Sequence, residues 1–498
     1  MRKLVHNGIL FPRYEPKGFK ITVQGRPMVL SPQQEEMAVA WVRKLGTEYA
    51  EDPIFVRNFF GDFCHALGLN HKLGPKDFDF SEIVKYVEGD RARKLSMSKD
   101  EKKRLAAERK AIREANKVKY GQAIVDGEKV DLGNYMAEPS CIFMGRGKHP
   151  LRGKWKEGPS EQDVILNLSP DAPRAPGNWK EIVWQPDSMW VAKWDDKLRG
   201  EEKYIWLADS SSVKQERDIE KYEKANMLDR KINDLRTHIV ANLKADDIKR
   251  RKVATVSYLI DTLKLRVGDE KDKDEADTVG ATTLRPEHLT VSENGHVVFD
   301  FLGKDSVRWY KEVELPEQVV ENLKEFMTDA KSSIFEGVRS NGVNEFLSEV
   351  VPGLSAKVFR TYHASMVVGE YLKTAKVSTD DPDYIKKNAA TMANLEAAII
   401  CNHKRKLPKN WENSLAKKME RLKVLQARKT KKSAEAVKAA KMRIRTMKAT
   451  RDYNLGTSLR SYIDPRLYYR WGQDVAFDWR LYYPKTLQRK FSWVEKTQ

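Results

Sequence analysis

The sequence predicts an α+β protein built from two or more packed units. A chain of 498 residues is too long for one hydrophobic core. Hydrophobic residues make up 40% of the chain, which is enough to fill several cores. Residues 122–210 look rich in strands, whereas the pattern from about residue 218 to 403 is mainly helical. Separate strand-rich and helix-rich stretches are typical of the α+β class.

The first hundred residues mix strand-like aromatic pieces with helices. Residues 19–23, followed by Gly25, predict a strand and a turn. Residues 31–45 have helical periodicity. Ser98 starts a capping box that opens a highly charged helix over about 99–118. This helix is either a solvated strut or a basic arm beside a polyanion. The strut needs fewer assumptions, and the two roles are compatible.

The middle of the chain passes from strands to helices and back. Residues 122–210 carry six tryptophans and many proline and glycine breaks, as short strands joined by turns do. The pattern is helical over about 218–265. A β segment follows over roughly 289–309, and its turn at 303–305 predicts a hairpin. Helices resume from about 316 to 403.

Residues 404–448 form a basic segment with 17 Lys and Arg, 3 acidic residues and no glycine. Apolar side chains recur there every three or four residues, in two stripes separated by a break at 429–433. The stripes are Leu415, Met419, Leu422 and Leu425, then Val437, Ala440, Ile444 and Met447. We therefore expect two antiparallel helices that pair along narrow seams, as a marginal and mobile element. So dense a positive charge favours a nearby phosphate backbone over a merely solvated face.

The whole chain is strongly basic, with 91 Lys and Arg against 72 Asp and Glu and a formal net charge of +19. Such an excess attracts polyanions, so nucleic acid is the first expected partner and an acidic membrane surface the second. No run approaches the roughly 20 apolar residues of a membrane span, and the basic N-terminus lacks the apolar stretch of a signal peptide. Three widely spaced cysteines argue for a reducing compartment.

Several common catalytic motifs are missing from the sequence. There is no phosphate-binding P-loop, so ATP use is not expected, and there is no H-E-x-x-H motif or evident carboxylate cluster for two metals. Cys401 and His403 lack a second pair at zinc spacing, which disfavours a structural zinc site. A basic protein without these groups can still cleave nucleic acid with a side-chain nucleophile. That route needs cations around the phosphate and an acid for the leaving oxygen.

Six motifs, together with a glycine-rich segment, strongly resemble those of eukaryotic-type type IB DNA topoisomerases, and the six occur in the family's order. The six motifs are residues 265–271, 276–280, 301–306, 356–365, 401–403 and 456–466, and the glycine-rich segment is 143–150. The resemblance covers nearly the whole chain, from about His6 to Trp493. Six ordered motifs make a chance match very improbable.

The resemblance implies a role for five residues. Tyr462 matches the nucleophile, whose oxygen attacks a phosphodiester and leaves a 3′-phosphotyrosine and a free 5′-hydroxyl. An ordinary phenol is mostly protonated at neutral pH, so nearby cations must stabilise its ionised form. Arg266 and Arg360 match the arginines that hold the nonbridging oxygens, for which a planar, permanently charged guanidinium is suited. His403 matches a donor to a nonbridging oxygen, and Lys304 matches the general acid for the departing 5′-oxygen.

Each of these residues alone has a simpler explanation. A tyrosine is usually a packed aromatic residue, a buried histidine or arginine is usually structural, and a lysine after a glycine is ordinary turn chemistry. The joint arrangement favours catalysis, because each residue sits in its own matched motif.

The resemblance also implies DNA contacts outside the catalytic set. Arg146 and Lys148 match a contact to the backbone or minor groove near the cleavage site, although a plain basic loop would look similar. Further candidates for DNA contacts are Lys271, Thr278, Asp305, Lys357 and Ser461.

A DNA clamp is the architecture that the resemblance implies. Residues 1–213 would form a DNA-binding lobe and residues 214–403 a mainly helical catalytic domain similar to that of tyrosine recombinases. Residues 404–450 would form a helical-hairpin linker, and residues 451–498 a C-terminal domain that carries Tyr462. The implied activity is relaxation of supercoiled duplex DNA by a monomer, without ATP. No cofactor or metal is expected to be required, because cationic side chains stabilise the charge, with Mg²⁺ acting at most as a stimulant.

The sequence departs from the family at a few points. It lacks the long, charged N-terminal region of cellular members, which usually carries the nuclear-targeting segment. We expect either a shortened piece of a longer protein or a compact member such as a large DNA virus encodes, acting in the nucleus or, if a virus encodes it, in viral factories or virions. Ser461 stands where the family usually has Asn, so weaker trapping by camptothecin-type poisons is expected. Met144 and Lys148 replace residues that are more often Arg and Asn.

Two other functions fit parts of the pattern. A tyrosine recombinase uses a similar Arg, Lys, His and Tyr set, but it is usually smaller, assembles as a tetramer and needs specific sites. The linker hairpin and the N-terminal clamp residues argue against it. A DNA-binding clamp without activity is the second alternative, and the intact set of five residues argues against that.

Overall fold

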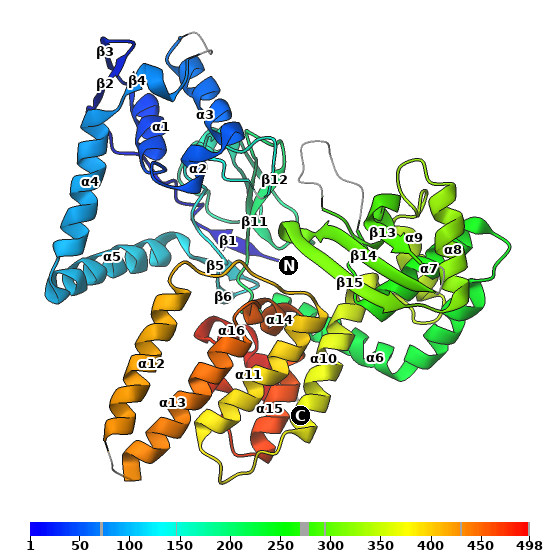
Figure 1. Ribbon diagram of the computed structural model, residues 1–498. Coiled ribbons are helices and arrows are strands. Elements are labelled where there is room, and N and C mark those ends of the chain that lie inside the picture. The colour runs from blue at the N-terminus through cyan, green and yellow to red at the C-terminus, as the bar shows by residue number, and fades with distance from the viewer. Residues whose placement is uncertain (70–72, 146, 269–277, 293–294, 429–430, 497–498) are drawn as a thin grey trace. The chain divides into compact units, whose positions relative to one another are not determined.

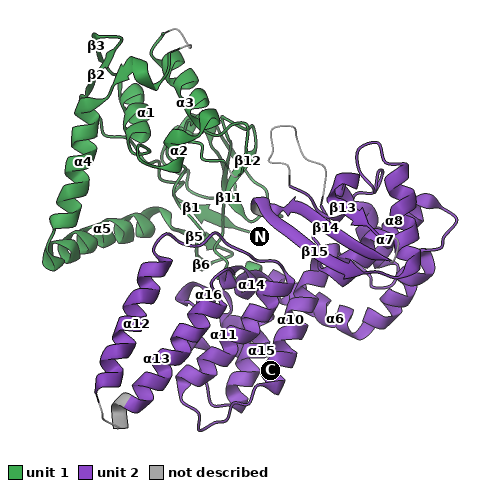
Figure 2. Cartoon of the chain, viewed as in Figure 1, with its two compact units in different colours: residues 1–214, 273–276 green, residues 215–272, 277–498 purple. Residues whose placement is uncertain are grey.

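The computed structural model describes residues 1–69, 73–145, 147–268, 278–292, 295–428 and 431–496. They form two compact units, the first over residues 1–214 and the second from residue 215 onward (Figures 1 and 2). Both units combine helices with small sheets, which confirms the predicted α+β class. None of the helices in this described part has the length and apolar character of a membrane span.

The first unit combines helices with short strands, and its described residues between 122 and 210 form strands and one 3₁₀ turn, which confirms the strand-rich prediction for that stretch. Its helices are α1 (Pro32–Val42), α2 (Glu48–Glu51), α3 (Pro53–Ala66), α4 (Ser81–Ser96) and α5 (Lys99–Tyr120), with the 3₁₀ turns η1 (Pro75–Asp77) and η2 (Glu161–Asp163). Its strands are β1 (Leu4–His6), β2 (Lys20–Val23), β3 (Arg26–Val29), β4 (Phe78–Asp79), β5 (Gln122–Val125), β6 (Glu128–Asp131), β7 (Cys141–Ile142), β8 (Trp155–Lys156), β9 (Ile165–Asn167), β10 (Glu181–Val183), β11 (Trp190–Asp195) and β12 (Glu202–Trp206). They pair as sheets β1-β5-β6, β3-β2-β4, β7-β8 and β10-β9-β11-β12.

Local signals in the first unit are confirmed. Strands β2 and β3 are joined by Gln24 and Gly25, which both have positive φ (48° and 81°), as a tight hairpin turn requires. The capping box at the start of α5 is complete: the Ser98 hydroxyl accepts from the Glu101 amide at 3.2 Å, and the Glu101 carboxylate accepts from the Ser98 amide at 2.7 Å. The helix predicted over 31–45 is α1, which ends at Val42.

Helix α3 is an element that the aromatic-rich pattern did not single out. It begins where the Asp52 carboxylate accepts from the amides of Ile54 and Phe55, at 2.9 and 3.3 Å. Phe55, Phe59 and Phe63 follow at four-residue intervals and are fully buried in the aromatic core of this region. The helix therefore depends on its cap and on tertiary packing, which override the strand preference of aromatic residues.

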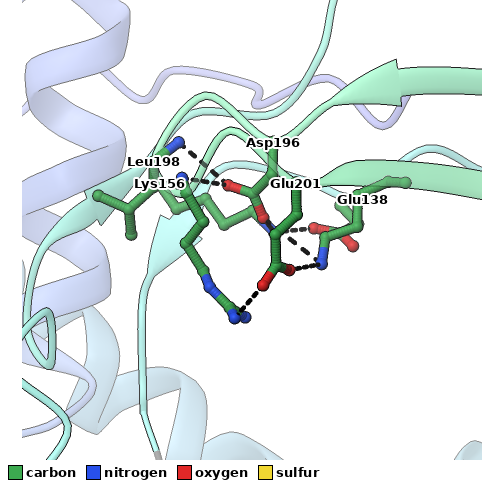
Figure 3. A network of polar contacts seen from close by, with 7 residues as sticks. Glu138, Lys156, Asp196, Leu198 and Glu201 are labelled. Carbon is green, nitrogen blue, oxygen red and sulfur yellow. Dashed lines mark hydrogen bonds and ion pairs between the residues drawn. The ribbon is translucent and has the colours of Figure 1, made fainter. Parts of the chain in front are cut away.

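An ion-pair network with a buried centre joins β8 to the loop after β11 and to the segment before β7 (Figure 3). The Lys156 ammonium lies 2.7 Å from a carboxylate oxygen of Asp196 and also pairs with Glu138. The other carboxylate oxygen of Asp196 accepts from the Leu198 amide at 3.0 Å. Because removal of one partner would leave a buried charge uncompensated, we attribute a structural role to this network.

The second unit is mainly helical, with one three-stranded sheet. Its helices are α6 (Ser212–Asn242), α7 (Ile248–Leu263), α8 (Glu317–Thr328), α9 (Ser340–Ser348), α10 (Ala356–Thr374), α11 (Asp383–Ile400), α12 (Trp411–Ala427), α13 (Lys431–Ala449), α14 (Leu455–Ser461), α15 (Pro465–Asp474) and α16 (Lys485–Lys490). The strands are β13 (Leu289–Val291), β14 (His296–Gly303) and β15 (Val307–Glu314), and the 3₁₀ turns are η3 (Ala281–Thr283), η4 (Pro286–His288), η5 (Lys304–Ser306), η6 (Trp479–Leu481) and η7 (Ser492–Glu495). The predicted hairpin is β14–β15, and it continues five residues beyond Trp309.

Two hydrophobic cores support the second unit. One joins α7, α8 and α9 to the inner face of the β13-β14-β15 sheet, around Phe299, Phe326 and Phe359. The other joins α10, α11, α14 and α15 to the C-terminal segment, around Tyr468 and Phe491. Helix α10 contributes side chains to both cores.

The basic segment forms the predicted pair of helices, α12 and α13, which pack against each other. Ile444 is buried in the seam, but Met419 is 45% exposed, so the first stripe is only partly covered. Helix α13 also packs against α11: Thr446 donates to the Asn388 side chain, and Tyr384 donates to Glu435 at 2.7 Å (Figure 1). The hairpin is therefore anchored to the helix that leads to His403.

Candidate active site

The predicted nucleophile Tyr462 lies directly after α14, and its hydroxyl meets a guanidinium. Nη1 of Arg266 donates to the phenolic oxygen at 3.0 Å, although the two residues are 196 positions apart in the chain. The backbone of Tyr462 is fixed on both sides: its amide donates to the Ser458 carbonyl at 2.9 Å, and its carbonyl accepts from the Ser365 hydroxyl at 3.3 Å. Its phenolic oxygen is therefore held beside a permanent positive charge.

Arg360 projects from α10, and its guanidinium is almost fully buried. It donates to the carbonyls of Lys264 and Cys401, at 3.1 and 2.6 Å, and its carbon lies 5.1 Å from the centre of the Tyr462 ring. Nε has no hydrogen-bond partner among the described residues. Because a buried donor without a partner is costly, this atom suits an anion that enters from outside.

His403 follows α11 and stacks on the nucleophile. The two ring centres are 5.3 Å apart, with an angle of 27° between the planes. Nε2 of His403 lies 3.1 Å from Nη2 of Arg360, and Nδ1 lies 2.7 Å from the Ser458 hydroxyl. Burial, together with the charges of Arg360 and Arg266, lowers the pKa of His403 to about 3. The imidazole is therefore neutral at neutral pH.

Lys304 lies at the turn of the β14–β15 hairpin and is exposed. It lines the same cavity as Arg266, Arg360 and His403. The Asn402 side chain donates to the Arg308 carbonyl at 3.3 Å and so joins the hairpin to the loop that carries His403. The structure thus brings together four of the five predicted catalytic residues around one cavity, and Tyr462 contacts the rim through Arg266.

Two glycines hold the loop that carries Arg266. Gly268 (φ 82°) and Gly280 meet backbone to backbone, and a Cβ on Gly280 would lie 2.4 Å from the Gly268 Cα. The Arg266 carbonyl accepts from the Ala281 amide at 2.8 Å, so the contact fixes the arginine directly. The motif glycines at these positions are required for close approach.

Gly280→Ala is expected to slow the strand cleavage that the family resemblance implies by about 10²-fold, because the methyl group would displace the Arg266 loop by roughly an ångström. The rate of covalent adduct formation measures the effect. Gly342→Ala is the matched control: nothing lies within 4 Å of a Cβ at that position, and the rate should stay at the wild-type value. An unchanged rate in Gly280→Ala would contradict this role of the loop.

The two ends of the linker meet beside the site. The Asn454 amide donates to the His403 carbonyl at 2.7 Å, and Lys404 pairs with Tyr453 in an isolated antiparallel bridge. The linker therefore begins after His403 and ends before Asn454, and these two residues are hydrogen-bonded to each other.

The other predicted DNA contacts are scattered. Arg146, Lys271 and the side chain of Asp305 lie outside the described residues. Lys148 is exposed in the first unit, Lys357 is exposed in the first turn of α10, and Thr278 is half-buried. Ser461 precedes the nucleophile at the end of α14, and its side chain is half-buried.

Sequence reasoning missed two residues behind the nucleophile. Ser458 lies within the matched motif but was given no role, and it contacts His403. Lys221 on α6 lies 3.4 Å from the Ser461 carbonyl and 3.0 Å from an Asp218 carboxylate oxygen. Burial lowers the pKa of Lys221, although Asp218 opposes the shift. No sequence signal could have found Lys221, because its contact spans 240 residues.

Within the described residues, no group of three or more His, Cys, Asp or Glu side chains could hold a metal ion. The site is instead a cation-lined cavity beside a tyrosine, an arrangement suited to a phosphodiester.

Three family models match consecutive parts of the chain. The eukaryotic DNA topoisomerase I DNA-binding fragment matches residues 1–207, the catalytic core of that family matches 210–436, and the C-terminal topoisomerase domain matches 434–498. The chain belongs to the eukaryotic DNA topoisomerase I family.

Named relatives agree with this membership. DNA topoisomerase 1 of Candidozyma auris is 37% identical over 85% of this chain and 58% of its own length. DNA topoisomerase 1 alpha of Arabidopsis thaliana is 35% identical over 99% of this chain and 58% of its own length. DNA topoisomerase 1 of Homo sapiens is 33% identical over 99% of this chain and 70% of its own length. The chain thus spans a little over half the length of the first two relatives.

Proposed function

We propose that this chain is a type IB DNA topoisomerase. It relaxes supercoiled duplex DNA without ATP by nicking one strand, allowing controlled rotation and resealing the nick. The single observation that carries the proposal is the 3.0 Å hydrogen bond from Arg266 to the hydroxyl of Tyr462, which joins two segments that match the family.

The proposed chemistry uses five side chains. The Tyr462 hydroxyl gives its proton to water as its oxygen attacks the phosphorus, the P–O5′ bond breaks, and the tyrosine stays joined to the 3′ end. Arg266 and Arg360 bind the nonbridging oxygens, and His403 donates a further hydrogen bond to one of them. Lys304 protonates the departing 5′-oxygen. Reversal of the same steps reseals the strand, and the phosphotyrosine bond conserves the energy that religation needs.

The supporting geometry is one cavity lined by Arg266, Lys304, Arg360 and His403, with Arg266 bonded to the phenolic oxygen of Tyr462. Four cationic or donating side chains can stabilise the charge that builds up on phosphorus, so we propose that neither a metal nor another cofactor is required, and that Mg²⁺ acts at most as a stimulant. In DNA relaxation by wild-type protein in EDTA, the expected result is complete relaxation without ATP. Plasmids that stay supercoiled would contradict the proposal.

The same assay separates the alternatives. A tyrosine recombinase would need a specific site and a tetramer, whereas we propose a monomer that relaxes any supercoiled plasmid. A clamp without activity would bind DNA and leave its linking number unchanged.

We further propose the architecture and location that the family resemblance implies. The first unit serves as a DNA-binding lobe of a clamp, and the second carries a catalytic domain like that of tyrosine recombinases. The residues that contact the DNA are Arg146, Lys148, Lys271, Thr278, Asp305, Lys357 and Ser461. The protein acts in the nucleus or, if a virus encodes it, in viral factories or virions.

Ser461→Asn is expected to strengthen trapping of the cleaved complex by camptothecin-type poisons. The serine offers a shorter side chain than the family's usual asparagine, so the wild type lacks an amide beside the cleaved phosphate. The measurement is the drug concentration that doubles the amount of cleaved DNA. Strong trapping of the wild type, with no further gain in the variant, would contradict the prediction.

Shortening the linker is expected to change rotation and religation more than cleavage. Deletion of residues 421–434, replaced by a short glycine-serine loop, keeps the contacts of Thr446 and Glu435 with α11. Single-molecule relaxation traces report the rotation rate, and a single-turnover assay reports cleavage. Identical traces for the deletion and the wild type would refute this role.

A further inference from the structure

His403 is almost fully buried and lies between the side chains of Ser458 and Arg360. Ser458 is completely buried, and Arg360 and His403 are each 6% exposed. The Ser458 hydroxyl faces Nδ1 at 2.7 Å, and Nη2 of Arg360 faces Nε2 at 3.1 Å. Both ring nitrogens therefore have partners in the free protein.

The identity of these partners fixes the position of the ring proton. A guanidinium can only donate hydrogen bonds, so Nε2 of His403 must accept from Arg360. The ring is neutral, because burial and the charges of Arg360 and Arg266 lower its pKa to about 3. Its single proton consequently lies on Nδ1 and is donated to the Ser458 oxygen.

The proposed role of His403 needs the opposite arrangement. Nδ1 bonds to the buried Ser458. Nε2 is therefore the ring nitrogen that can form a hydrogen bond with a phosphate in the cavity. An acceptor nitrogen would repel an anionic oxygen, and a donor N–H is required instead. The two neutral tautomers must therefore exchange when a phosphate oxygen takes the place of Arg360.

We propose that Ser458 is a positioning residue that allows His403 to switch between its two neutral tautomers, an inference that rests on the proposed function. In the free protein the serine hydroxyl accepts from Nδ1–H. With phosphate in the cavity, the hydroxyl rotates and donates to Nδ1, while Nε2–H donates to a nonbridging oxygen. The ring gives its Nδ1 proton to water and takes a proton from water at Nε2, so its charge stays zero. A hydroxyl can serve both states, because it is donor and acceptor at once.

Ser458 also touches the nucleophile through its backbone. Its carbonyl accepts from the amides of Tyr462 and Ile463, at 2.9 and 3.1 Å. One residue thus links the histidine before the linker to the tyrosine after it. A useful test must separate the hydroxyl from this backbone contact, which every substitution at the position leaves in place.

A double-mutant cycle separates the effect of the Ser458 hydroxyl on His403 from the effect of the Ser458 backbone on Tyr462. Ser458→Ala should slow single-turnover cleavage about 10- to 100-fold, the usual cost of losing a partner that orients a histidine. In a His403→Ala background the same change should cost nothing further, because the serine acts through the histidine. Ser458→Thr keeps the hydroxyl and should recover most of the rate. Ser257→Ala is the matched control, a completely buried helical serine bonded to the Val253 carbonyl, and should cleave at the wild-type rate. Additive losses in the cycle would overturn the proposal.

The tautomer itself can be read by nuclear magnetic resonance with ¹⁵N-labelled histidine. His403 is assigned by the signals missing in His403→Ala. The free wild type should show the proton on Nδ1, and a complex with nicked duplex DNA and orthovanadate, a mimic of five-coordinate phosphorus, should show it on Nε2. A proton that stays on one nitrogen in both states would overturn the proposal. If the wild type formed no covalent DNA adduct, the proposed function would be wrong. The tautomer of the free protein could still be measured, so the two failures are distinguishable.

Discussion

Tyr462→Phe should abolish DNA relaxation and lower strand cleavage by about 10⁵-fold or more, because no other group replaces a deleted nucleophile. The phenylalanine ring can keep the stacking on His403, so the loss reports the oxygen alone. DNA binding should persist, because the cations of the site remain. Plasmid relaxation in EDTA and a filter-binding assay measure the two properties on the same preparation.

Tyr469→Phe serves as the control for that variant. Tyr469 lies on α15, in the same C-terminal segment, and is half-buried beside the same core. Its change removes a tyrosine hydroxyl without touching the cavity, so wild-type relaxation is expected. Residual cleavage by Tyr462→Phe above the background of uncatalysed DNA would point to another nucleophile.

Arg360→Lys should reduce cleavage by about 10²- to 10³-fold, the usual cost of removing one donor aimed at developing charge. The guanidinium holds the Lys264 and Cys401 carbonyls and His403 at once, and a single ammonium cannot reproduce that planar fork. The carbonyls left without a donor should also destabilise the fold by about 1–3 kcal/mol each. Single-turnover cleavage and thermal unfolding measure these effects separately.

Arg251→Lys is the control for charge-preserving substitution. Arg251 pairs with Glu325 through two hydrogen bonds, at 2.8 and 2.7 Å, and lies outside the cavity. Its variant should cleave normally. If Arg360→Lys also cleaved normally, a simple positive charge would suffice at this position, and the need for a planar guanidinium there would be wrong.

Periodicity and capping predicted those parts of the fold that local sequence controls. The capping box at Ser98, the turn at Gly25 and the β14–β15 hairpin all arise from residues close together in the chain. The two helices of the basic segment followed from apolar spacing. Helix α3 escaped prediction, because its phenylalanines favour strands locally and only the packed core selects the helix.

The sequence predicted which residues belong to the candidate site, but not which of their atoms contact one another. Motif resemblance supplied Tyr462 and its four partners, whereas the contact of Ser458 with His403 crosses the whole linker. The backbone meeting of Gly268 with Gly280 and the approach of Lys221 to Ser461 likewise join distant segments. Such contacts depend on tertiary packing, and no spacing in the sequence encodes them.

Chemical identification of the covalent link tests the central claim most directly. Wild-type protein is incubated with a duplex whose cleaved strand loses its short 5′-hydroxyl fragment, so that resealing fails and the adduct accumulates. After digestion, mass spectrometry should find the peptide that contains Tyr462 attached to a 3′-phosphate. A link through any other residue, a link to a 5′-phosphate, or no link at all would contradict the account.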